Sequence, residues 1–390
     1  MLDLAARIET PKSAAEVAEI VASGRPLEVV GGATKRTIGA VRGAEALVSL
    51  AGLARVIDYA PEELVLTAQP GVTLATLEKL VASQGQMLPF EPPHLGKLLG
   101  APAKLFGGKA TLGGTLAANL SGPRRIRAGA ARDHLLGFEA VTGRGELVKA
   151  GGRVVKNVTG YDLSKLMAGS WGTLAVMTEV TIKVLPAPRC ETTLMLFGLD
   201  DARAGRAMAQ AMNAPMEVSG AAHLPQAVAA SAPLKAEMAV TALRLEGFEA
   251  SVAARGEALS GLLREFGRAE RLEGELSAGF WAQVREVEAF RKDPRPLWRV
   301  SVPPASGWRV GAGSGSTLHD WAGGLVWLAT EAPAAAVRAE ARALGGHATL
   351  YRGEGPAFEP LAGTLAALTA RVKAAFDPDG RLNPGRFAEA

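Results

Sequence analysis

The spacing of apolar residues along the first half of the chain predicts short helices and strands. Residues 13–16 carry Ser and Glu at the spacing of a helix N-terminus, and Val17, Ile20 and Val21 supply one apolar face. Residues 27–30 form an apolar run that leads into a Gly-rich loop, which is typical of a buried strand. Further strands are predicted at residues 47–50, 56–59, 64–69, 138–142, 146–149 and 173–185, and further helices at residues 73–83 and 163–167.

The pattern changes after residue 187, where prolines punctuate the end of a long predicted strand. Beyond this point strand-like runs alternate with longer amphipathic segments, which favours a split β-α-β layer with helices on one face of a sheet. We therefore expect an α+β protein with one domain at residues 1–187 and another at residues 188–390. Strands are predicted at residues 191–197, 216–222, 238–246, 298–302, 324–330 and 347–351, and helices at residues 201–212, 250–266, 278–290, 332–343 and 361–376.

Composition narrows the classes of function that are open to this chain. Of its 390 residues, 48% are hydrophobic and 21% are charged, and the net charge of +4 comes without a block of like charges, so nothing indicates nucleic-acid binding. Cys190 is the only cysteine, which excludes an internal disulfide and an iron–sulfur cluster held by cysteines. The five histidines lack the spacing of a zinc site, and no metal site is expected. A redox centre in this protein would therefore be a bound organic cofactor.

The location of the protein is predicted from two absences in the sequence. No apolar run is long enough to span a bilayer, and residues 1–10 carry charges where a signal peptide would be apolar. We therefore expect a cytoplasmic protein without a membrane span. Residues 86–109 are rich in Pro, Gly and Lys and predict a long loop, which at this length is usually functional or mobile.

Three Gly-rich segments carry the candidate chemistry. Residues 31–35 follow a buried strand, and their adjacent glycines let successive N–H groups point into one concavity that suits phosphate oxygens, although two glycines after a strand also make a plain turn. The segment at residues 110–122 suits a short helix whose free N–H groups face an anion, or a tightly packed Ala/Gly helix. At residues 169–179 small side chains run into an apolar strand, which lets a flat ring lie against the backbone or marks a loop-to-strand transition.

In this order and spacing, the segments resemble the FAD-binding PCMH-type domain of the vanillyl-alcohol-oxidase superfamily. The matching pieces are residues 29–35, 68–72, 111–114 and 169–179. The resemblance implies a FAD-binding domain of two α/β subdomains, followed by a ferredoxin-like C-terminal domain of the FAD-linked oxidases. The tail at residues 376–387 resembles that of FAD-linked 2-hydroxy-acid dehydrogenases and is expected to return to the flavin site.

The same resemblance implies which residues hold the cofactor. The loop at residues 31–35 would cradle the FAD pyrophosphate, and the backbone near residues 175–176 would lie against the nucleotide. Some members of the superfamily attach FAD through a His in the first loop, whereas this chain has Thr34 and Lys35 there, so non-covalent FAD is expected. The expected cofactor-binding residues are Gly31, Gly32, Ala33, Thr34, Lys35, Pro70, Gly71, Leu112, Gly113, Gly114, Asn119, Ser121, Ala175 and Val176.

Four further stretches resemble the smaller FAD-binding subunit of bacterial glycolate oxidases, namely residues 89–93, 121–125, 155–163 and 346–350. This resemblance implies a redox subunit that takes part in the oxidation of glycolate, a small 2-hydroxy acid, to glyoxylate. In that family the partners are a larger FAD subunit and an iron–sulfur subunit, which receive the electrons. Through these partners the protein would sit at the inner face of the cell membrane without spanning it.

The catalytic residues are not evident from the sequence. Arg124, Arg125 and Lys156 lie in Gly- and Ala-rich surroundings and are candidates to hold a carboxylate or a phosphate, with surface solvation as the alternative, and His347 is a further candidate. The Glu-His-Gly motif of subunits that oxidise 2-hydroxy acids is absent, so catalysis by this chain alone is not expected. The alternatives are a self-sufficient FAD-dependent 2-hydroxy-acid or alcohol dehydrogenase or oxidase, and a structural subunit that FAD stabilises.

Overall fold

The computed structural model describes residues 8–39, 41–101, 106–152, 161–232 and 235–387, which fold into two compact units. Unit 1 consists of Met1–Leu120, Ala130–Ala187 and Pro360–Ala390, and unit 2 consists of Ser121–Gly129 and Pro188–Glu359. These units differ from a simple division at residue 187 in two segments. Ile126 packs into a core of unit 2, and Leu382 pairs with Leu27 of unit 1, so each segment follows its tertiary contacts rather than its place in the chain.

Unit 1 contains two main sheets. The smaller sheet is parallel with the strand order β1-β3-β2, and the larger is antiparallel with the order β4-β5-β9-β7-β8. The helices and strands of this unit are β1 (Ile8–Glu9), α1 (Ala14–Ala22), β2 (Leu27–Val30), β3 (Ala46–Ser49), β4 (Val56–Ala60), β5 (Val65–Ala68), α2 (Leu74–Ala82), β6 (Gln86–Met87), α4 (Leu112–Ala117), α6 (Ala131–His134), β7 (Leu135–Thr142), β8 (Leu147–Gly151), α7 (Leu163–Met167), β9 (Ala175–Lys183), β10 (Leu185–Pro186) and α13 (Gly363–Phe376).

Local sequence signals explain how these elements begin and pack. Ser13 caps α1 by accepting a hydrogen bond from the N–H of Glu16 at 3.2 Å, as the Ser-x-x-Glu spacing predicts. The apolar face of α1 places Val17 in a core that it shares with β2 and β3. On the larger sheet a second core joins β5 and β9 to α2 and α4, with Leu66, Leu112 and Val180 fully buried in it.

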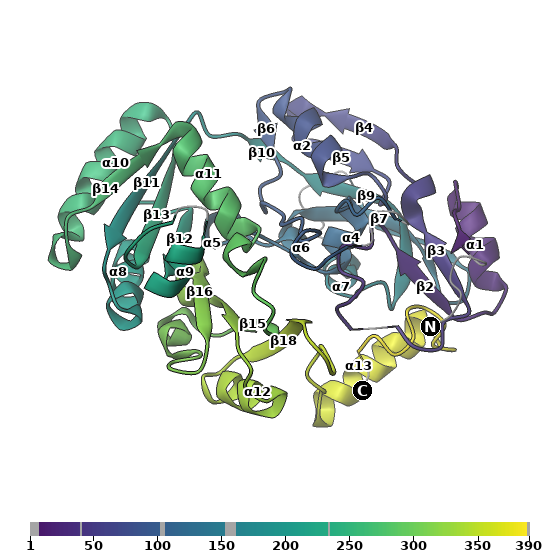
Figure 1. Ribbon diagram of the computed structural model, residues 1–390. Helices are drawn as coiled ribbons and strands as arrows, with labels where there is room; N and C mark the ends of the chain where they lie inside the picture. The colour runs from purple at the N-terminus through teal and green to yellow at the C-terminus, as the bar shows by residue number, and fades with distance from the viewer. Residues whose placement is uncertain (1–7, 40, 102–105, 153–160, 233–234, 388–390) are drawn as a thin grey trace. The chain divides into compact units, whose positions relative to one another are not determined.

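The C-terminal tail returns to the strand that precedes the first Gly-rich loop (Figure 1). After α13, Leu382 forms a parallel bridge with Leu27, and the N–H of Leu27 donates to the carbonyl of Arg381 at 2.7 Å. Asp377 is buried and accepts hydrogen bonds from the N–H groups of Arg381 and Leu382 and from the Lys373 amine. The tail is therefore bound firmly to the small sheet of unit 1.

Unit 2 is built on one long antiparallel sheet with the strand order β14-β11-β13-β12-β16-β17-β15-β18. One core lies between this sheet and the helices α8 and α10, and another lies beneath α12. The helices and strands of this unit are α5 (Arg125–Ala128), β11 (Cys190–Phe197), α8 (Asp201–Asn213), β12 (Gly220–Leu224), α9 (Gln226–Ser231), β13 (Val240–Gly247), α10 (Glu249–Leu262), β14 (Glu270–Glu273), α11 (Gly274–Arg285), β15 (Leu297–Ser301), β16 (Ser316–Asp320), β17 (Leu325–Ala329), α12 (Ala334–Ala343) and β18 (His347–Arg352).

The helices of unit 2 do not all cover the same face of the sheet, which corrects the expectation of a one-sided layer. Leu194 on β11 faces the core formed with α8 and α10. The neighbouring Thr193 faces the other way and hydrogen-bonds to Ser277 and Trp281 of α11. Because successive side chains of a strand point to opposite faces, α11 covers the second face.

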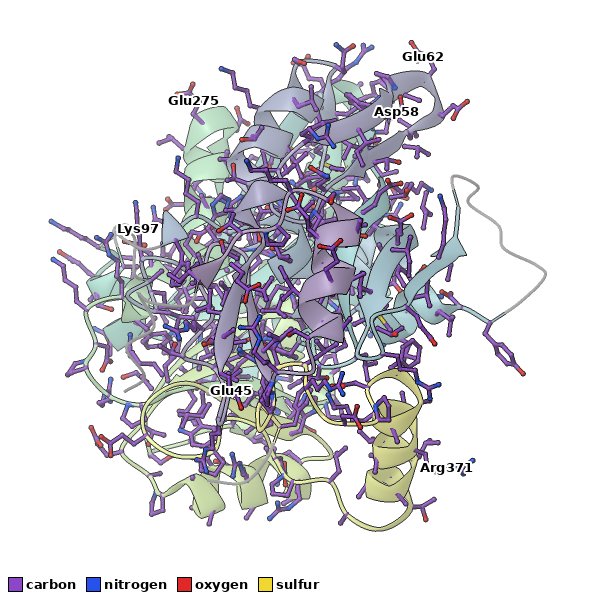
Figure 2. All side chains as sticks on the ribbon, turned by 90° about the vertical axis from the view of Figure 1, so that its right-hand side faces the viewer. Glu45, Asp58, Glu62, Lys97, Glu275 and Arg371 are labelled. Carbon is purple, nitrogen blue, oxygen red and sulfur yellow. The ribbon has the colours of Figure 1, made fainter. Side chains whose placement is uncertain are left out.

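The α+β class is confirmed, and several differences from the predicted elements lie in weakly patterned strands. The expected strand at residues 216–222 starts only at Gly220, because Glu217 adopts a left-handed backbone with φ of 50°. The structure adds β14, a charged strand at the sheet edge, and β16, and neither has an apolar run long enough to stand out in the sequence. Exposed charges such as Glu45, Glu62 and Arg371 are distributed over the outside of unit 1 (Figure 2). None of the helices in the described ranges has the length and apolar character needed to cross a membrane.

Candidate functional site

A cleft in unit 1 brings the Gly-rich segments together. The space between its lining residues, including the part open to solvent, amounts to about 700 Å³. Its walls come from the loop after β2, the start of α4, the turn before β9 and the C-terminal tail. Segments that lie far apart in the sequence therefore meet at one site.

The loop at residues 31–35 presents a row of backbone donors to this cleft. Within the described part of the chain, the N–H groups of residues 32–35 donate no hydrogen bond, although residues 32–35 are all buried. Ala33 has a left-handed backbone with φ of 54°, and a left-handed residue in a turn can direct neighbouring N–H groups into one concavity. Buried N–H groups without an acceptor are rare in folded proteins, so this loop is suited to receive an anion.

Lys35 adds a buried positive charge to the same loop. Its side chain is only 8% exposed, and its amine donates to the hydroxyl of Thr34 at 3.0 Å. No carboxylate among the described residues forms an ion pair with it. Burial lowers the pKa of Lys35 from 10.5 to about 8, because the charged form loses its hydration. An anion in the cleft would supply the missing opposite charge.

The glycines of the site are required by close contacts within the protein. A Cβ on Gly32 would lie 1.7 Å from the carbonyl oxygen of Lys109, and a Cβ on Gly113 would lie 2.4 Å from the Cβ of Pro70. Neither glycine has a positive φ, and in the loop of Gly32 the left-handed residue is Ala33. These glycines therefore allow loops to pack against each other, which in turn shapes the cleft.

The start of α4 does not offer free N–H groups, which the anion-binding alternative for this segment requires. The N–H of Leu112 donates to the carbonyl of Val72 at 2.9 Å, and that of Gly113 donates to the carbonyl of Pro70 at 2.8 Å. The N–H of Gly114 bonds to the hydroxyl of Thr111, which caps the helix. Gly113 and Gly114 line the cleft, but the donors of this turn serve packing, so that interpretation was wrong.

The apolar side of the cleft is formed by the turn at residues 171–172 and by residues 175–177 at the start of β9. Trp171 and Gly172 both have positive φ, at 53° and 68°. The amide of Asn383 in the tail holds this turn by donating to the carbonyl of Trp171 at 2.7 Å, and its oxygen accepts from the N–H of Val29 at 2.7 Å. The Asn383 side chain therefore connects β2 to the turn. Beside the loop at residues 32–35, this part of the cleft offers a surface of small and apolar residues that suits a flat ring.

Comparison with known proteins identifies the group of proteins to which this site belongs. The chain is 38% identical over 334 residues to glycolate oxidase subunit GlcE of Escherichia coli strain K12, which covers 85% of this chain and 84% of the relative. The chain belongs to this family of glycolate oxidase subunits. A family model described as FAD binding domain matches residues 5–151.

Other relatives match less than half of this chain. Glycolate oxidase subunit GlcD of Bacillus subtilis strain 168 is 33% identical over 141 residues, covering 36% of this chain and 27% of the relative. D-lactate dehydrogenase of Anaerostipes hadrus is 35% identical over 177 residues, covering 45% of this chain and 33% of the relative. The fold resembles alkyldihydroxyacetonephosphate synthase with a TM-score of 0.65 and 18% identity, covering 97% of this chain and 76% of that one.

The family comparison identifies the cofactor. FAD as the cofactor and an oxidoreductase function are confirmed by the FAD-binding domain and by the FAD-linked relatives. The buried donors of residues 32–35 and the buried amine of Lys35 fit the phosphates of such a dinucleotide. Among the described residues, no group of three or more His, Cys, Asp or Glu side chains is arranged to hold a metal ion.

Several residues expected at the cofactor lie outside the cleft lining. Gly71 lies behind the wall, since its Cβ would come within 2.0 Å of the Leu50 carbonyl oxygen, and Leu112 is fully buried in the core. Asn119 accepts a hydrogen bond from the N–H of Arg132 at 2.9 Å, and Ser121 belongs to unit 2. The other expected residues line the cleft, namely Gly31, Gly32, Ala33, Thr34, Lys35, Pro70, Gly113, Gly114, Ala175 and Val176.

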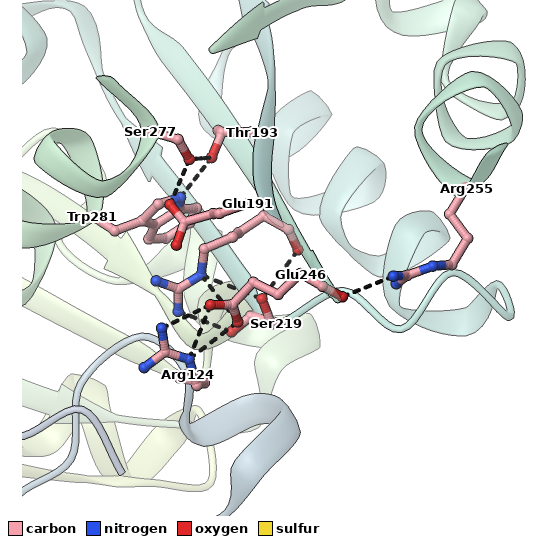
Figure 3. A network of polar contacts seen from close by, with 9 residues as sticks. Arg124, Glu191, Thr193, Ser219, Glu246, Arg255, Ser277 and Trp281 are labelled. Carbon is pink, nitrogen blue, oxygen red and sulfur yellow. Dashed lines mark hydrogen bonds and ion pairs between the residues drawn. The ribbon is translucent and has the colours of Figure 1, made fainter. Parts of the chain in front are cut away.

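The candidates for substrate binding are not gathered in the cleft of unit 1. Arg124 lies in unit 2, where its guanidinium contacts the Glu246 carboxylate at 2.7 Å (Figure 3). Burial alone would raise the pKa of Glu246, but Arg244 and Arg124 together lower it, so this carboxylate is held as an anion. A substrate carboxylate would have to compete with Glu246 for Arg124.

The other basic candidates are dispersed. Arg125 lies over the Trp321 ring, with its guanidinium carbon 4.2 Å from the ring centroid. His347 opens β18 as an exposed residue paired with Ser301. Lys156 lies outside the described residues. Arg124, Arg125 and His347 all belong to unit 2, and the lining of the cleft in unit 1 includes none of them.

Sequence reasoning missed cleft residues that act through tertiary contacts. Arg36 lines the cleft and donates two hydrogen bonds of 2.7 Å to the buried carboxylate of Glu28. Asn383 and Arg386 reach the cleft from the tail, for which the expected return of residues 376–387 was the only signal. Trp171 showed no signal beyond its small neighbours.

Proposed function

We propose that this chain is the FAD-carrying redox subunit of a glycolate oxidase complex and takes part in the oxidation of glycolate to glyoxylate. The observation that carries the proposal is the anion loop of residues 32–35 with its buried Lys35 amine. This loop lies in a chain that shares 38% identity with a glycolate oxidase subunit over most of its length. Both support a bound FAD whose function depends on other subunits.

Different residues of the cleft would bind different parts of the cofactor. The N–H groups of residues 32–35 and the Lys35 amine bind the pyrophosphate, and the backbone of residues 175–176 supports the flat part of the nucleotide. The tail holds the wall in place through Asn383. When bound, the flavin supplies the acceptor for hydride and the donor of electrons to the next centre. We expect the attachment to be non-covalent, because the loop offers Thr34 and Lys35 and no His.

The proposed partners are a larger FAD subunit and an iron–sulfur subunit. The single Cys190 means that this chain cannot hold an iron–sulfur cluster by cysteines, so in the proposed complex such a cluster belongs to another subunit. The Arg124 guanidinium is already engaged by Glu246, which supports the view that substrate binds elsewhere in the complex. We further propose that the partners hold the complex in the cytoplasm at the inner face of the membrane.

The decisive experiment compares the lone chain with the co-expressed complex. Both are purified, their flavin content is measured, and glycolate turnover is followed with a dye acceptor. The lone chain should contain FAD and show no turnover, whereas the complex should turn over glycolate. Robust turnover by the lone chain would instead favour a self-sufficient dehydrogenase. A folded chain that takes up no FAD would contradict the proposal altogether.

A further inference from the structure

The C-terminal tail contributes a second buried cation to the cleft of unit 1. Arg386 is 5% exposed and lines the cleft. One of its terminal nitrogens donates to the carbonyl of Ile38 at 2.9 Å, and its guanidinium carbon lies 6.0 Å from the Trp171 ring centroid. Its buried Nε has no hydrogen-bond partner among the described residues. This side chain therefore retains an unused donor inside the site.

No carboxylate of the described residues neutralises this guanidinium. Glu28 is an acidic group that raises the pKa of Arg386, but its carboxylate already accepts two hydrogen bonds from Arg36. Burial lowers the pKa of Arg386 to about 10, with Glu28 opposing this effect and Arg36 adding to it. A buried, unpaired cation is strongly unfavourable, so its presence at a cleft indicates an anionic ligand.

The tail places Arg386 rigidly with respect to the anion loop. Asn383 accepts a hydrogen bond from the N–H of Val29, which lies two residues before the loop. The N–H of Arg42, beyond the loop, donates to the carbonyl of Pro384 at 2.9 Å. The tail is therefore tied to the chain on both sides of residues 31–35, and Lys35 and Arg386 are presented to the same cleft from opposite ends of the sequence.

We propose that Arg386 is the second positive charge of the dinucleotide site, so that Lys35 and Arg386 together neutralise the pyrophosphate. Through Arg386, binding of the cofactor also fastens the C-terminal tail to unit 1. The inference rests on the proposed FAD function and adds a residue and a coupling to it. A pyrophosphate diester carries one negative charge on each phosphate, and the cleft offers these two cations without ion pairs. The fork of an arginine can bind a phosphate through two nitrogens, whereas lysine acts as a point charge.

The first test measures ligand affinity of the apoprotein by calorimetry, with FAD, ADP and adenosine as probes. Arg386→Met should weaken the binding of FAD and of ADP by about 10- to 100-fold, because each ligand loses a hydrogen bond to a charged group. The affinity for adenosine, which has no phosphate, should be unchanged. Arg386→Lys should recover part of this loss, because it restores the charge without the fork. The matched control is Arg381→Met in the same tail, since Arg381 pairs with the exposed Asp379 and does not line the cleft.

The second test follows hydrogen exchange of the tail at residues 377–387. FAD should slow exchange there in the wild type and in Arg381→Met, but much less in Arg386→Met. If Arg386→Met does not fold, Arg386→Lys decides, with several-fold weaker FAD and ADP binding and unchanged adenosine binding expected. Variants at Arg386 that bind FAD and ADP as the wild type does would overturn the inference and leave the proposed function intact. A wild-type apoprotein that binds neither FAD nor ADP would instead overturn the proposed function.

Discussion

Replacement of Lys35 by Met should stabilise the apoprotein and weaken cofactor binding at the same time. Burial lowers the pKa of Lys35 from 10.5 to about 8, and one pKa unit corresponds to about 1.4 kcal/mol, so the charged amine destabilises the folded apoprotein by about 3 kcal/mol near neutral pH. Met has a similar length and no charge, so it removes this penalty. The same change removes a charged hydrogen bond to the cofactor, which should weaken FAD binding by about 10- to 100-fold.

The pH dependence gives this prediction its sharpest form. Below about pH 8 the folded and unfolded chains both keep the Lys35 proton, and the full penalty is present. Between about pH 8 and 10.5 the folded chain loses the proton first, so the unfolded chain binds more protons and wild-type stability rises with pH. The advantage of Lys35→Met should therefore shrink by about 3 kcal/mol across this interval.

Urea unfolding of the apoproteins at several pH values measures this difference. Lys79→Met serves as the control, because Lys79 is exposed on α2 of the same unit and should change neither stability nor FAD affinity. FAD affinity is measured in parallel by quenching of flavin fluorescence. An advantage of Lys35→Met that stays constant from neutral to alkaline pH would show that the amine is not desolvated in the apoprotein. Unchanged FAD affinity would refute its role in the site.

Three further predictions concern the loop, the tail and the second unit. Gly32→Ala should abolish FAD binding in a flavin assay, because its Cβ would overlap the Lys109 carbonyl. Ala33→Gly should keep FAD and should leave stability unchanged or raise it by up to about 1 kcal/mol, because glycine tolerates φ of 54°. Equal FAD binding by the two variants would refute this account. Asp377→Ala should destabilise unit 1 by at least about 2 kcal/mol in urea unfolding, because three donors lose a buried carboxylate, and a neutral effect would contradict the tail packing. Arg124→Met should leave FAD affinity unchanged but destabilise unit 2, because Glu246 loses its 2.7 Å partner; a loss of FAD instead would place Arg124 at the cofactor.

The elements that the sequence predicted well are those with local causes. The cap of α1 at Ser13 needs only residues a few positions away, which the Ser and Glu at residues 13–16 supply. The loop at residues 32–35 also has a local cause, because its unpaired N–H groups come from consecutive residues, and its role in anion binding stays a prediction. Local geometry follows from local sequence when the interacting groups are neighbours along the chain.

The sequence was a weaker guide wherever a group's role depends on a distant partner. The glycine-rich start of α4 has the composition of an anion site, yet its N–H groups donate to Pro70 and Val72. Arg124 was an open candidate for a substrate anion until Glu246, more than a hundred positions later in the chain, was seen to neutralise it. Donors and charges are used by whichever acceptor the fold brings near, and composition cannot show which one that is.

The order of residues was enough to predict the α+β class, the Gly-rich loop that offers backbone donors, and the family whose members bind FAD. The burial of Lys35, the close approach of the Lys109 carbonyl to Gly32, and the arrival of Arg386 at the same cleft as the loop became known from the fold. Burial, steric contact and electrostatic interaction depend on distances in space, which residues far apart in the chain do not reveal. The contact between Arg386 and Ile38 joins residues 348 positions apart in the chain, and no local pattern of residues reports it.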